Sequence, residues 1–383
     1  MKKFYLLAAV AATLMGVACN KNIDTPELSV PDMQAGKAMV SLRVAPGSNR
    51  AQTRAAGDAV ADTQAERTIN TIDVFYINHA TKLIDSYAGT FTQDANAADG
   101  ATIVNAVKVT NVPMDIWVIA NAPASLKASI LDEASLKSAV SAFTQNTADN
   151  LVMVGYKENV NLPAIQATTR EGKEYKLVDG IVLERMVNKV TVGKIVKAFR
   201  APALQAATVS IEGMYIVNAA KEARYTAKIE GADAVPAAAV ASYFNTDEPF
   251  EQNELITFDA DPTAALEVTA NGTDLNKSFY FYPNPAVEAN AVSENDFVTK
   301  LVLKVRIGQK FYWYPIGIVQ NAADARNLVY QIDTITLRGL GNDPDQPHKP
   351  NDYIDEANVE VQLTVKDWVA ADLGGSFNDW MVE

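Results

Sequence analysis

Alternation of apolar and polar side chains with a period of two is the feature that most constrains the fold of this chain. In residues 38–45 every second side chain is aliphatic or Ala, and successive side chains of a β-strand point to opposite faces of its sheet. Similar runs, mostly separated by Gly, Pro, Asn or Asp clusters, lie at 72–77, 102–109, 115–119, 174–182, 187–199, 208–217, 223–229, 278–283, 297–307, 310–319, 328–338 and 357–366. The sequence therefore predicts an all-β protein built from stacked β-sandwiches.

Residues 124–143 are the exception to this pattern. Their apolar residues recur at a spacing near 3.6, and Pro123 stands near the start, so we expect a helical insertion. The length of 383 residues favours two domains. Residues 20–36 are expected to form a tether, 47–67 an exposed loop and 341–352 a turn-rich linker.

The N-terminus has the pattern of an export signal. Lys2 and Lys3 precede an apolar run over 4–15, which is too short to cross a bilayer, and small residues then lead to Cys19. We expect a lipoprotein signal that is removed before Cys19, with acylation of the Cys19 thiol. An ordinary secretory signal followed by a free cysteine is the alternative. Because Cys19 is the only cysteine, the protein has no intrachain disulfide.

Composition argues against several classes of function. The formal net charge is −13, which disfavours a nucleic-acid partner. Two histidines and one cysteine leave little from which to build a His/Cys metal site or a Cys–His nucleophile, and both His79 and His348 are expected to be solvated loop residues. Phosphate-binding and dinucleotide-binding motifs are absent from the sequence. We expect no enzymatic activity, no cofactor and no metal, although a converging carboxylate pair stays open among the 46 acidic residues.

Two aromatic rows, 279–282 and 311–314, have two interpretations. Alternate residues of a strand face opposite sides, so half of each row is expected to be core and half to cover a surface or an interface. The alternative is a sugar-stacking platform that includes Trp313 and Tyr314. That alternative would make the protein a surface glycan-binding β-sandwich lipoprotein.

Two distant strands carry the same pattern of apolar side chains. The first has Ala38, Val40, Leu42 and Val44 on one face, and the second has Val359, Val361, Leu363 and Val365. The first precedes a loop that holds Arg50 and Arg54, and the second follows the linker near the chain end. The second strand could therefore replace the first in a neighbouring molecule by β-strand addition. Two ordinary sandwich strands are the alternative.

Several segments resemble the major fimbrial subunits (fimbrillins, type V pilins) of Gram-negative anaerobes. Residues 357–368 resemble the terminal strand of that family, and 325–332 with Gly339-Leu340-Gly341 resemble the region before it. Residues 183–192, LERMVNKVTV, resemble the entry into the family's C-terminal domain. The lipoprotein start and the Arg-Ala-Ala-Gly-Asp loop at 54–58 also match.

This resemblance implies an all-β protein of two tandem transthyretin-like β-sandwich domains with small helical insertions. The expected segments are a signal peptide at 1–18, a propeptide at 19–54, an N-terminal domain at 55–182 and a C-terminal domain at 183–383. The propeptide would carry the placeholder strand Ala38, Val40, Leu42 and Val44. The C-terminal domain would end in the donor strand Val359, Val361, Leu363, Val365 and Trp368.

The resemblance also implies a life cycle. An outer-membrane lipoprotein precursor is cut by a trypsin-like, Arg-specific protease, and the mature subunit joins other copies of itself or related fimbrial subunits head to tail in a surface fimbrium. We favour cleavage between Arg54 and Ala55, with Arg50 as the alternative, because small residues flank both arginines. The sequence names no adhesion target. A strand at 38–45 sealed inside a sheet, with both neighbours paired and no route out, would contradict the exchange.

Overall fold

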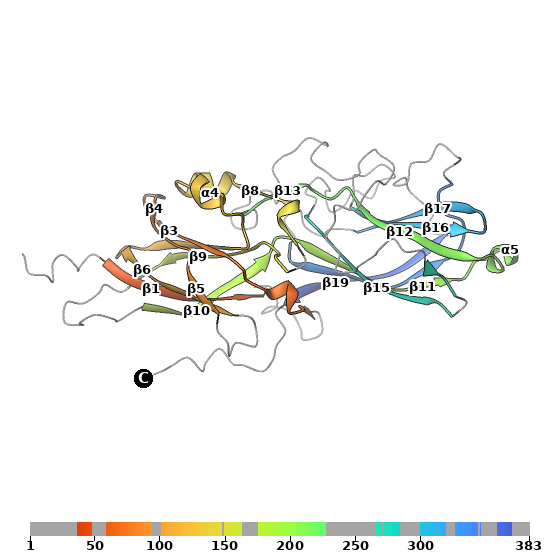
Figure 1. Cartoon of the computed structure of the whole chain (residues 1–383), viewed down its shortest axis with the longest axis horizontal. Helices are drawn as coiled ribbons and strands as arrows, with labels where there is room; N and C mark the ends of the chain where they lie inside the picture. The colour runs from red at the N-terminus through yellow and green to blue at the C-terminus, as the bar shows by residue number, and fades with distance from the viewer. Residues whose placement is uncertain are drawn as a thin grey trace, which may run out of the picture.

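The protein is an elongated molecule with two β-domains placed end to end, and the long strands run along its length (Figure 1). The computed structural model describes residues 37–47, 59–93, 101–147, 149–162, 175–226, 266–269, 271–283, 299–318, 326–343, 345 and 358–369. These ranges consist mostly of β-strands, as the period-two alternation predicts. The expected fold class, an all-β protein of two sandwiches with small helical insertions, is therefore confirmed. Cys19, Arg50, Arg54, Ala55 and His348 lie outside the described residues.

The N-terminal domain is a folded-over sheet of eight strands in the order β4-β3-β7-β9-β10-β1-β6-β5. β9 and β10 pair through only Val154 with Glu184 and Met153 with Arg185, while β4 of one half contacts β6 of the other. An apolar core that includes Val40, Tyr76 and Val118 lies within this fold. The strands are β1 (Lys37–Pro46), β3 (Ile72–Asn78), β4 (Ile84–Ala88), β5 (Phe91–Gln93), β6 (Thr102–Thr110), β7 (Met114–Ala120), β9 (Met153–Val160) and β10 (Tyr175–Arg185).

The helical insertion is broken into short pieces, so the prediction of one helix over 124–143 is only partly right. α3 (Leu126–Ser129) ends where Ile130 is extended, and α4 (Glu133–Ser138) restarts at Asp132, whose side chain caps the N–H of Ser135. Apolar side chains of the insertion pack with Phe75 and Trp117, on the face of β3 and β7 opposite the first core. This second covering explains why β7 is buried throughout. The insertion ends in β8 (Val140–Ala142) and the 3-10 helix η3 (Phe143–Gln145).

The C-terminal domain places two sheets face to face. The first has the order β15-β11-β18-β19-β2 and the second the order β14-β12-β16-β17. Their strands are β2 (Ala59–Ala61), β11 (Asn188–Lys197), β12 (Val209–Val217), β14 (Leu266–Glu267), β15 (Thr273–Phe281), β16 (Lys300–Ile307), β17 (Lys310–Gly317), β18 (Leu328–Leu337) and β19 (Val359–Val369). A short helix, α5 (Pro202–Gln205), follows β11.

The two domains share one apolar core and are joined by a pair of hydrogen-bonded strands. One apolar cluster runs from Trp117 in the N-terminal domain to Tyr314 in the C-terminal domain. β8 also pairs antiparallel with β13 (Glu222–Arg224), which belongs to the other half of the chain. The shared apolar cluster and the β8–β13 pairing therefore couple the two domains, in addition to the chain that links them.

Within the described residues, no helix has both the length and the apolar character needed to cross a membrane.

Candidate functional site: the β1 strand and the domain junction

β1 is an interior strand of the N-terminal sheet. It pairs parallel with β10, where Val40 is opposite Tyr175, and antiparallel with β6, where Val40 is opposite Val107. Its residues are the only described part of the chain that precedes Arg50 and Arg54. Removing β1 would therefore leave two unpaired strand edges that face one another across one strand's width.

The two faces of β1 differ in burial. The four residues predicted for the placeholder strand, Ala38, Val40, Leu42 and Val44, are each at most 1% exposed and lie in the N-terminal core. On the opposite face Ser41 is buried, whereas Met39 and Arg43 are only half-buried. This opposite face is the side on which β1 is least enclosed.

The end of β1 is fixed at the domain junction. The N–H of Gly47 donates to the Leu183 carbonyl at 2.9 Å, and the Gly47 carbonyl accepts from Asn327 Nδ2 at 2.9 Å. Asn327 Nδ2 also donates to the Trp368 carbonyl at 2.9 Å. One side chain therefore holds the end of β1 and the end of β19 together.

β19, the predicted donor strand, is docked in its own C-terminal domain. It pairs with β18 along its length and with β2 at Asp367–Val369. Val361, Leu363 and Val365 are half-buried against the core, while Val359 is buried. Trp368 is fully buried. In this molecule the strand is thus part of a folded domain, so its use as a donor requires it to leave β18.

Trp368 is packed between aromatic and cationic groups. Its ring stacks on Tyr280 with centroids 5.8 Å apart, and the Arg185 guanidinium lies 4.4 Å from its centroid. The Lys189 ammonium lies 5.5 Å away. These contacts are cation–π interactions in a water-poor site.

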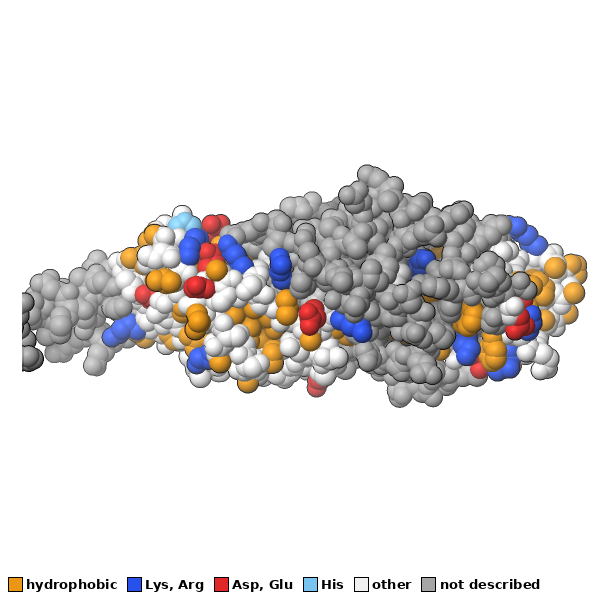
Figure 2. Space-filling view, turned by 90° about the horizontal axis from the view of Figure 1, so that it is seen from above, with side chains coloured by type: hydrophobic (Ala, Val, Ile, Leu, Met, Phe, Trp, Pro, Cys, Tyr) orange, Lys and Arg blue, Asp and Glu red, His pale blue; other side chains and the backbone are white. Residues whose placement is uncertain are grey.

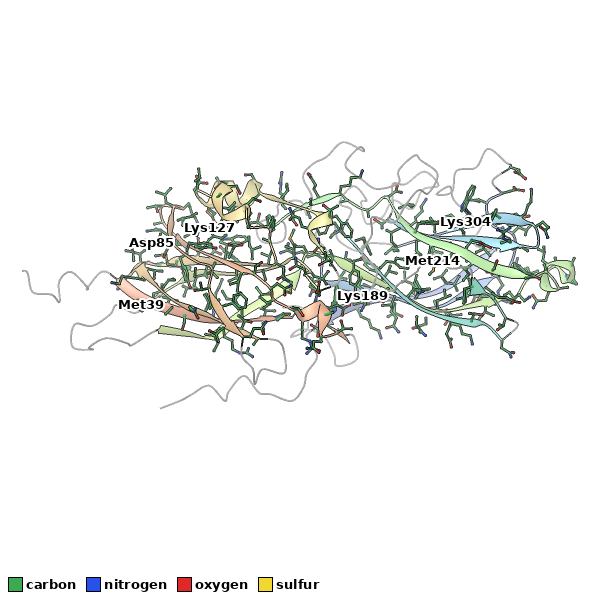
Figure 3. All side chains as sticks on the ribbon, in the orientation of Figure 1. Met39, Asp85, Lys127, Lys189, Met214 and Lys304 are labelled. Carbon is green, nitrogen blue, oxygen red and sulfur yellow. The ribbon has the colours of Figure 1, made fainter. Side chains whose placement is uncertain are left out.

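A buried charge network surrounds this tryptophan, and the sequence analysis missed it. Arg185 forms an ion pair with Asp62 and donates from Nε to the Glu66 carbonyl at 3.0 Å. Lys189 Nζ lies 2.6 Å from Glu66 Oε1, which also accepts from the Tyr280 hydroxyl at 2.5 Å. Figure 3 shows Lys189 where the two domains meet. The segment after β2 thereby attaches itself to the C-terminal domain.

Burial and pairing act against each other on these charges. Burial raises the pKa of Glu66, but the Lys189 charge and hydrogen bonds from Lys189, Tyr280 and Thr63 outweigh it, so the pKa is lowered. Burial lowers the pKa of Arg185, and the nearby Asp62 and Glu66 charges oppose that shift only in part. Arg185 keeps its charge at neutral pH despite this shift, because the ordinary pKa of a guanidinium is very high.

His79 lies in the turn after β3, as the sequence predicts, but its side chain is only 34% exposed and has a buried partner. Its Nδ1 lies 2.7 Å from Oδ1 of Asp115, a carboxylate that is fully buried at the start of β7. Lys82 Nζ lies 2.7 Å from Asp115 Oδ2, and the Asn159 N–H donates to Oδ1 at 2.9 Å. Burial raises the pKa of Asp115, but these donors outweigh it and lower the pKa. His79 and Asp115 were hidden from sequence reasoning because 36 residues separate them.

With Glu158, these two residues could offer three metal ligands, since their ligand atoms lie within 4.8 Å of one another. However, both oxygens of Asp115 already have partners, His79 Nδ1 and the Asn159 N–H at Oδ1 and the Lys82 ammonium at Oδ2. We therefore interpret the cluster as a salt-bridge network.

The aromatic row 279–282 is buried throughout, whereas the row 311–314 alternates as the sequence predicts, with Phe311 and Trp313 half-buried. Tyr280, Phe281, Tyr282 and Tyr314 are fully buried, and the Tyr314 hydroxyl donates to the Gly339 carbonyl at 2.8 Å. Tyr314 is thus unavailable to a sugar. On the face seen in Figure 2, basic, acidic and hydrophobic side chains of the described residues are interspersed.

These features define a two-domain β-sandwich protein with a buried N-terminal strand. Residues 38–185 match the family model for the major fimbrial subunit protein, FimA. The match begins at β1 and ends with β10, the strand that pairs with it. The resemblance to the fimbrial subunit family is therefore confirmed over this part of the chain.

Solved structures share the fold over most of the chain. A candidate cell adhesion protein from Parabacteroides distasonis has a TM-score of 0.56 at 17% identity, covering 88% of this chain and 98% of that one. One from Bacteroides eggerthii has a TM-score of 0.55 at 16% identity, with 88% and 97% covered. A Porphyromonas gingivalis fimbrilin has a TM-score of 0.52 at 14% identity, with 88% and 98% covered. The comparison with curated proteins gave no match.

Proposed function

We propose that this protein is a structural subunit of surface fimbriae that polymerises by strand exchange. In this proposal Cys19 carries the lipid of an outer-membrane precursor, an Arg-specific protease cuts after Arg54, and β1 then leaves. The C-terminal strand of another copy takes its place. The observation that carries the proposal is the position of β1: its apolar face is fully buried, and the chain between it and β2 holds Arg50 and Arg54.

The cut is needed because the resident strand has a large advantage. While β1 is tethered, it competes at an effective concentration of roughly millimolar or higher, and an incoming strand makes similar contacts. Each fully buried aliphatic side chain stabilises the resident strand by about 1.5–3 kcal/mol. Cutting the loop turns β1 into a fragment that can dissociate. The vacated site would then offer apolar pockets and two rows of unpaired backbone groups.

The interior position of β1 makes exchange slow. Two ladders must break before β1 is free, since the strand cannot slide off an edge of the sheet. Both neighbours of β1 are paired, so two of the three conditions named above against the exchange are met and the proposal depends on a route out. We place that route at the face of Met39 and Arg43, which are half-buried, although Ser41 and Ala45 on the same face are buried. The donor has a comparable barrier, because β19 must separate from β18.

The experiment treats the purified precursor with an Arg-specific protease and follows mass and assembly over days. We expect a product that begins at Ala55 and slowly forms ladders on mild-detergent gels. Arg54→Ala combined with Arg50→Ala should abolish both results, whereas Arg200→Ala, which changes an exposed arginine, should abolish neither. A trimmed protein that stays monomeric at high concentration would contradict the proposal.

A further inference from the structure

β19 has one edge that β18 occupies and one where, among the described strands, only β2 pairs. The Trp368 N–H donates to the Asn327 carbonyl at 3.2 Å, and the Asn358 carbonyl accepts from the Arg338 N–H at 2.8 Å. Even-numbered residues of β19 therefore direct their backbone groups toward β18. Because backbone groups alternate along a strand, odd-numbered residues direct theirs toward the other edge.

The open part of this edge has sharp limits. β2 pairs there with Asp367–Val369 only. Over Val359–Lys366 none of the strands in the described ranges pairs with it. Within the described ranges, the backbone groups of Val361, Leu363 and Val365 thus form a row without a strand partner, and a row of this kind is a template for another strand.

We propose that this edge is a self-association surface, on which β19 of a second copy pairs antiparallel about a two-fold axis at Leu363. The proposal concerns the uncut precursor, in which β19 keeps its place beside β18, so it does not depend on strand exchange. In this register Leu363 is opposite Leu363 of the second copy, and Val361 is opposite Val365. All of these are odd-numbered residues, so each pair can exchange ladder hydrogen bonds.

Charge complementarity selects the register. Glu360 is 54% exposed at its side chain and lies on the polar face of β19 with Lys366. Its Oε2 accepts from Arg338 of the neighbouring β18 at 2.8 Å, so Oε1 is the oxygen that we assign to a second copy. With the axis at Leu363, each Glu360 stands opposite a Lys366 of the other copy, and directly opposed unlike charges stabilise an antiparallel pair. A shift by two residues in either direction instead places Glu360 opposite Thr364 or Trp368. Of these registers, only the one centred on Leu363 places a Glu360 opposite a Lys366 at both ends of the contact.

The geometry also predicts the size of the assembly. The paired segment Glu360–Lys366 ends where β2 begins to pair at Asp367. Each copy offers the same surface, so the contact is isologous and closes as a dimer. This edge contact thus differs from head-to-tail polymerisation.

Sedimentation velocity of the full-length precursor tests the proposal. Arg50→Ala and Arg54→Ala are present in every sample, so processing and strand exchange cannot occur. We expect a dimer for the parent protein. Glu360→Lys and Lys366→Glu should each weaken association about tenfold, because each opposes like charges at both ends of the contact.

An equimolar mixture of the two variants provides the decisive control. In the mixed pair a Lys stands opposite a Glu at both ends, so the mixture should recover the dimer. Asp333→Lys, a charge reversal at an exposed position of the neighbouring β18, should leave it unchanged. A monomeric parent at about 0.1 mM, or a mixture no stronger than either variant alone, would overturn the proposal and leave the proposed function unaffected.

Discussion

At the scale of single residues, the unusual feature is a set of buried charges where the domains meet. Glu66 is fully buried and Lys189 nearly so, and their ion pair holds the start of one domain against the other. Removing one partner of such a pair typically costs about 3–5 kcal/mol, because the other charge stays buried. The network therefore makes stability depend on pH.

Glu66 gives this dependence a definite sign. Its pKa is lower in the folded protein than the usual 4.5, so its contribution is complete above about pH 4.5 and is lost as pH falls through the folded value. We expect Glu66→Gln to lower the free energy of unfolding at pH 7 and the difference from wild type to shrink steadily below pH 4.5. Urea denaturation at a series of pH values measures this. A difference that stays constant down to pH 2.5 would show that the charge is not responsible.

Asn327 provides a second prediction at this scale. Its φ is 60°, and its amide oxygen accepts from the Arg185 N–H at 3.2 Å while its amide nitrogen holds Gly47 and Trp368. We expect Asn327→Ala to lower the free energy of unfolding of the precursor by about 2–4 kcal/mol, from lost buried hydrogen bonds and a strained left-handed backbone. Asn327→Gly should recover about 1 kcal/mol of this in the same denaturation assay. Equal effects would exclude backbone strain.

At the scale of elements, β1 is an integral strand of the sheet that the proposed exchange requires to detach. Leu42→Ala should destabilise the precursor by about 2–5 kcal/mol, since Leu42 is 1% exposed in the core. Met39→Ala, on the half-buried face, should cost clearly less. Once the protein has been cut and β1 has been removed, Leu42 is no longer present, so both variants should yield mature proteins of identical stability. Differential scanning calorimetry before and after processing compares them.

The sequence predicts the elements better than their partners. Period-two alternation correctly predicts β1, β3, β16, β17 and β18 because each buries one face or both. β9 was missed because only its first residues and Val160 are apolar and buried. The pairing of β2 with β19 was missed because it joins residues about 300 positions apart.

The candidate site shows the same limit. The sequence predicts the buried face of β1, since burial follows from the side chains themselves. Asp62 and Glu66 look like ordinary loop charges, and only the fold brings them to Arg185 and Lys189. Lipidation at Cys19 and cleavage at Arg54 stay predictions, because both lie outside the described residues.

At the scale of the whole molecule, the two domains form one packed body. The apolar cluster continues from one domain to the other. The Tyr282 hydroxyl crosses the boundary, where it donates to Ser141 Oγ at 2.8 Å and accepts from Asn146 Nδ2 at 2.9 Å. We expect a single calorimetric unfolding transition. Tyr282→Phe should lower its midpoint by a few degrees, while Leu83→Ala, at an exposed position, should not. Two separate wild-type transitions would contradict a shared core.

The alignment of the long strands with the molecular axis has a mechanical consequence (Figure 1). Ladder hydrogen bonds in a sheet lie across the strands, so a pull along the axis loads the bonds on both sides of β1 in shear. All of them must then yield together instead of opening one after another like a zipper. If a donor strand takes that position after proteolysis, the joint would resist flow over the cell surface far better than one in which the same bonds lie along the fibre and open in turn.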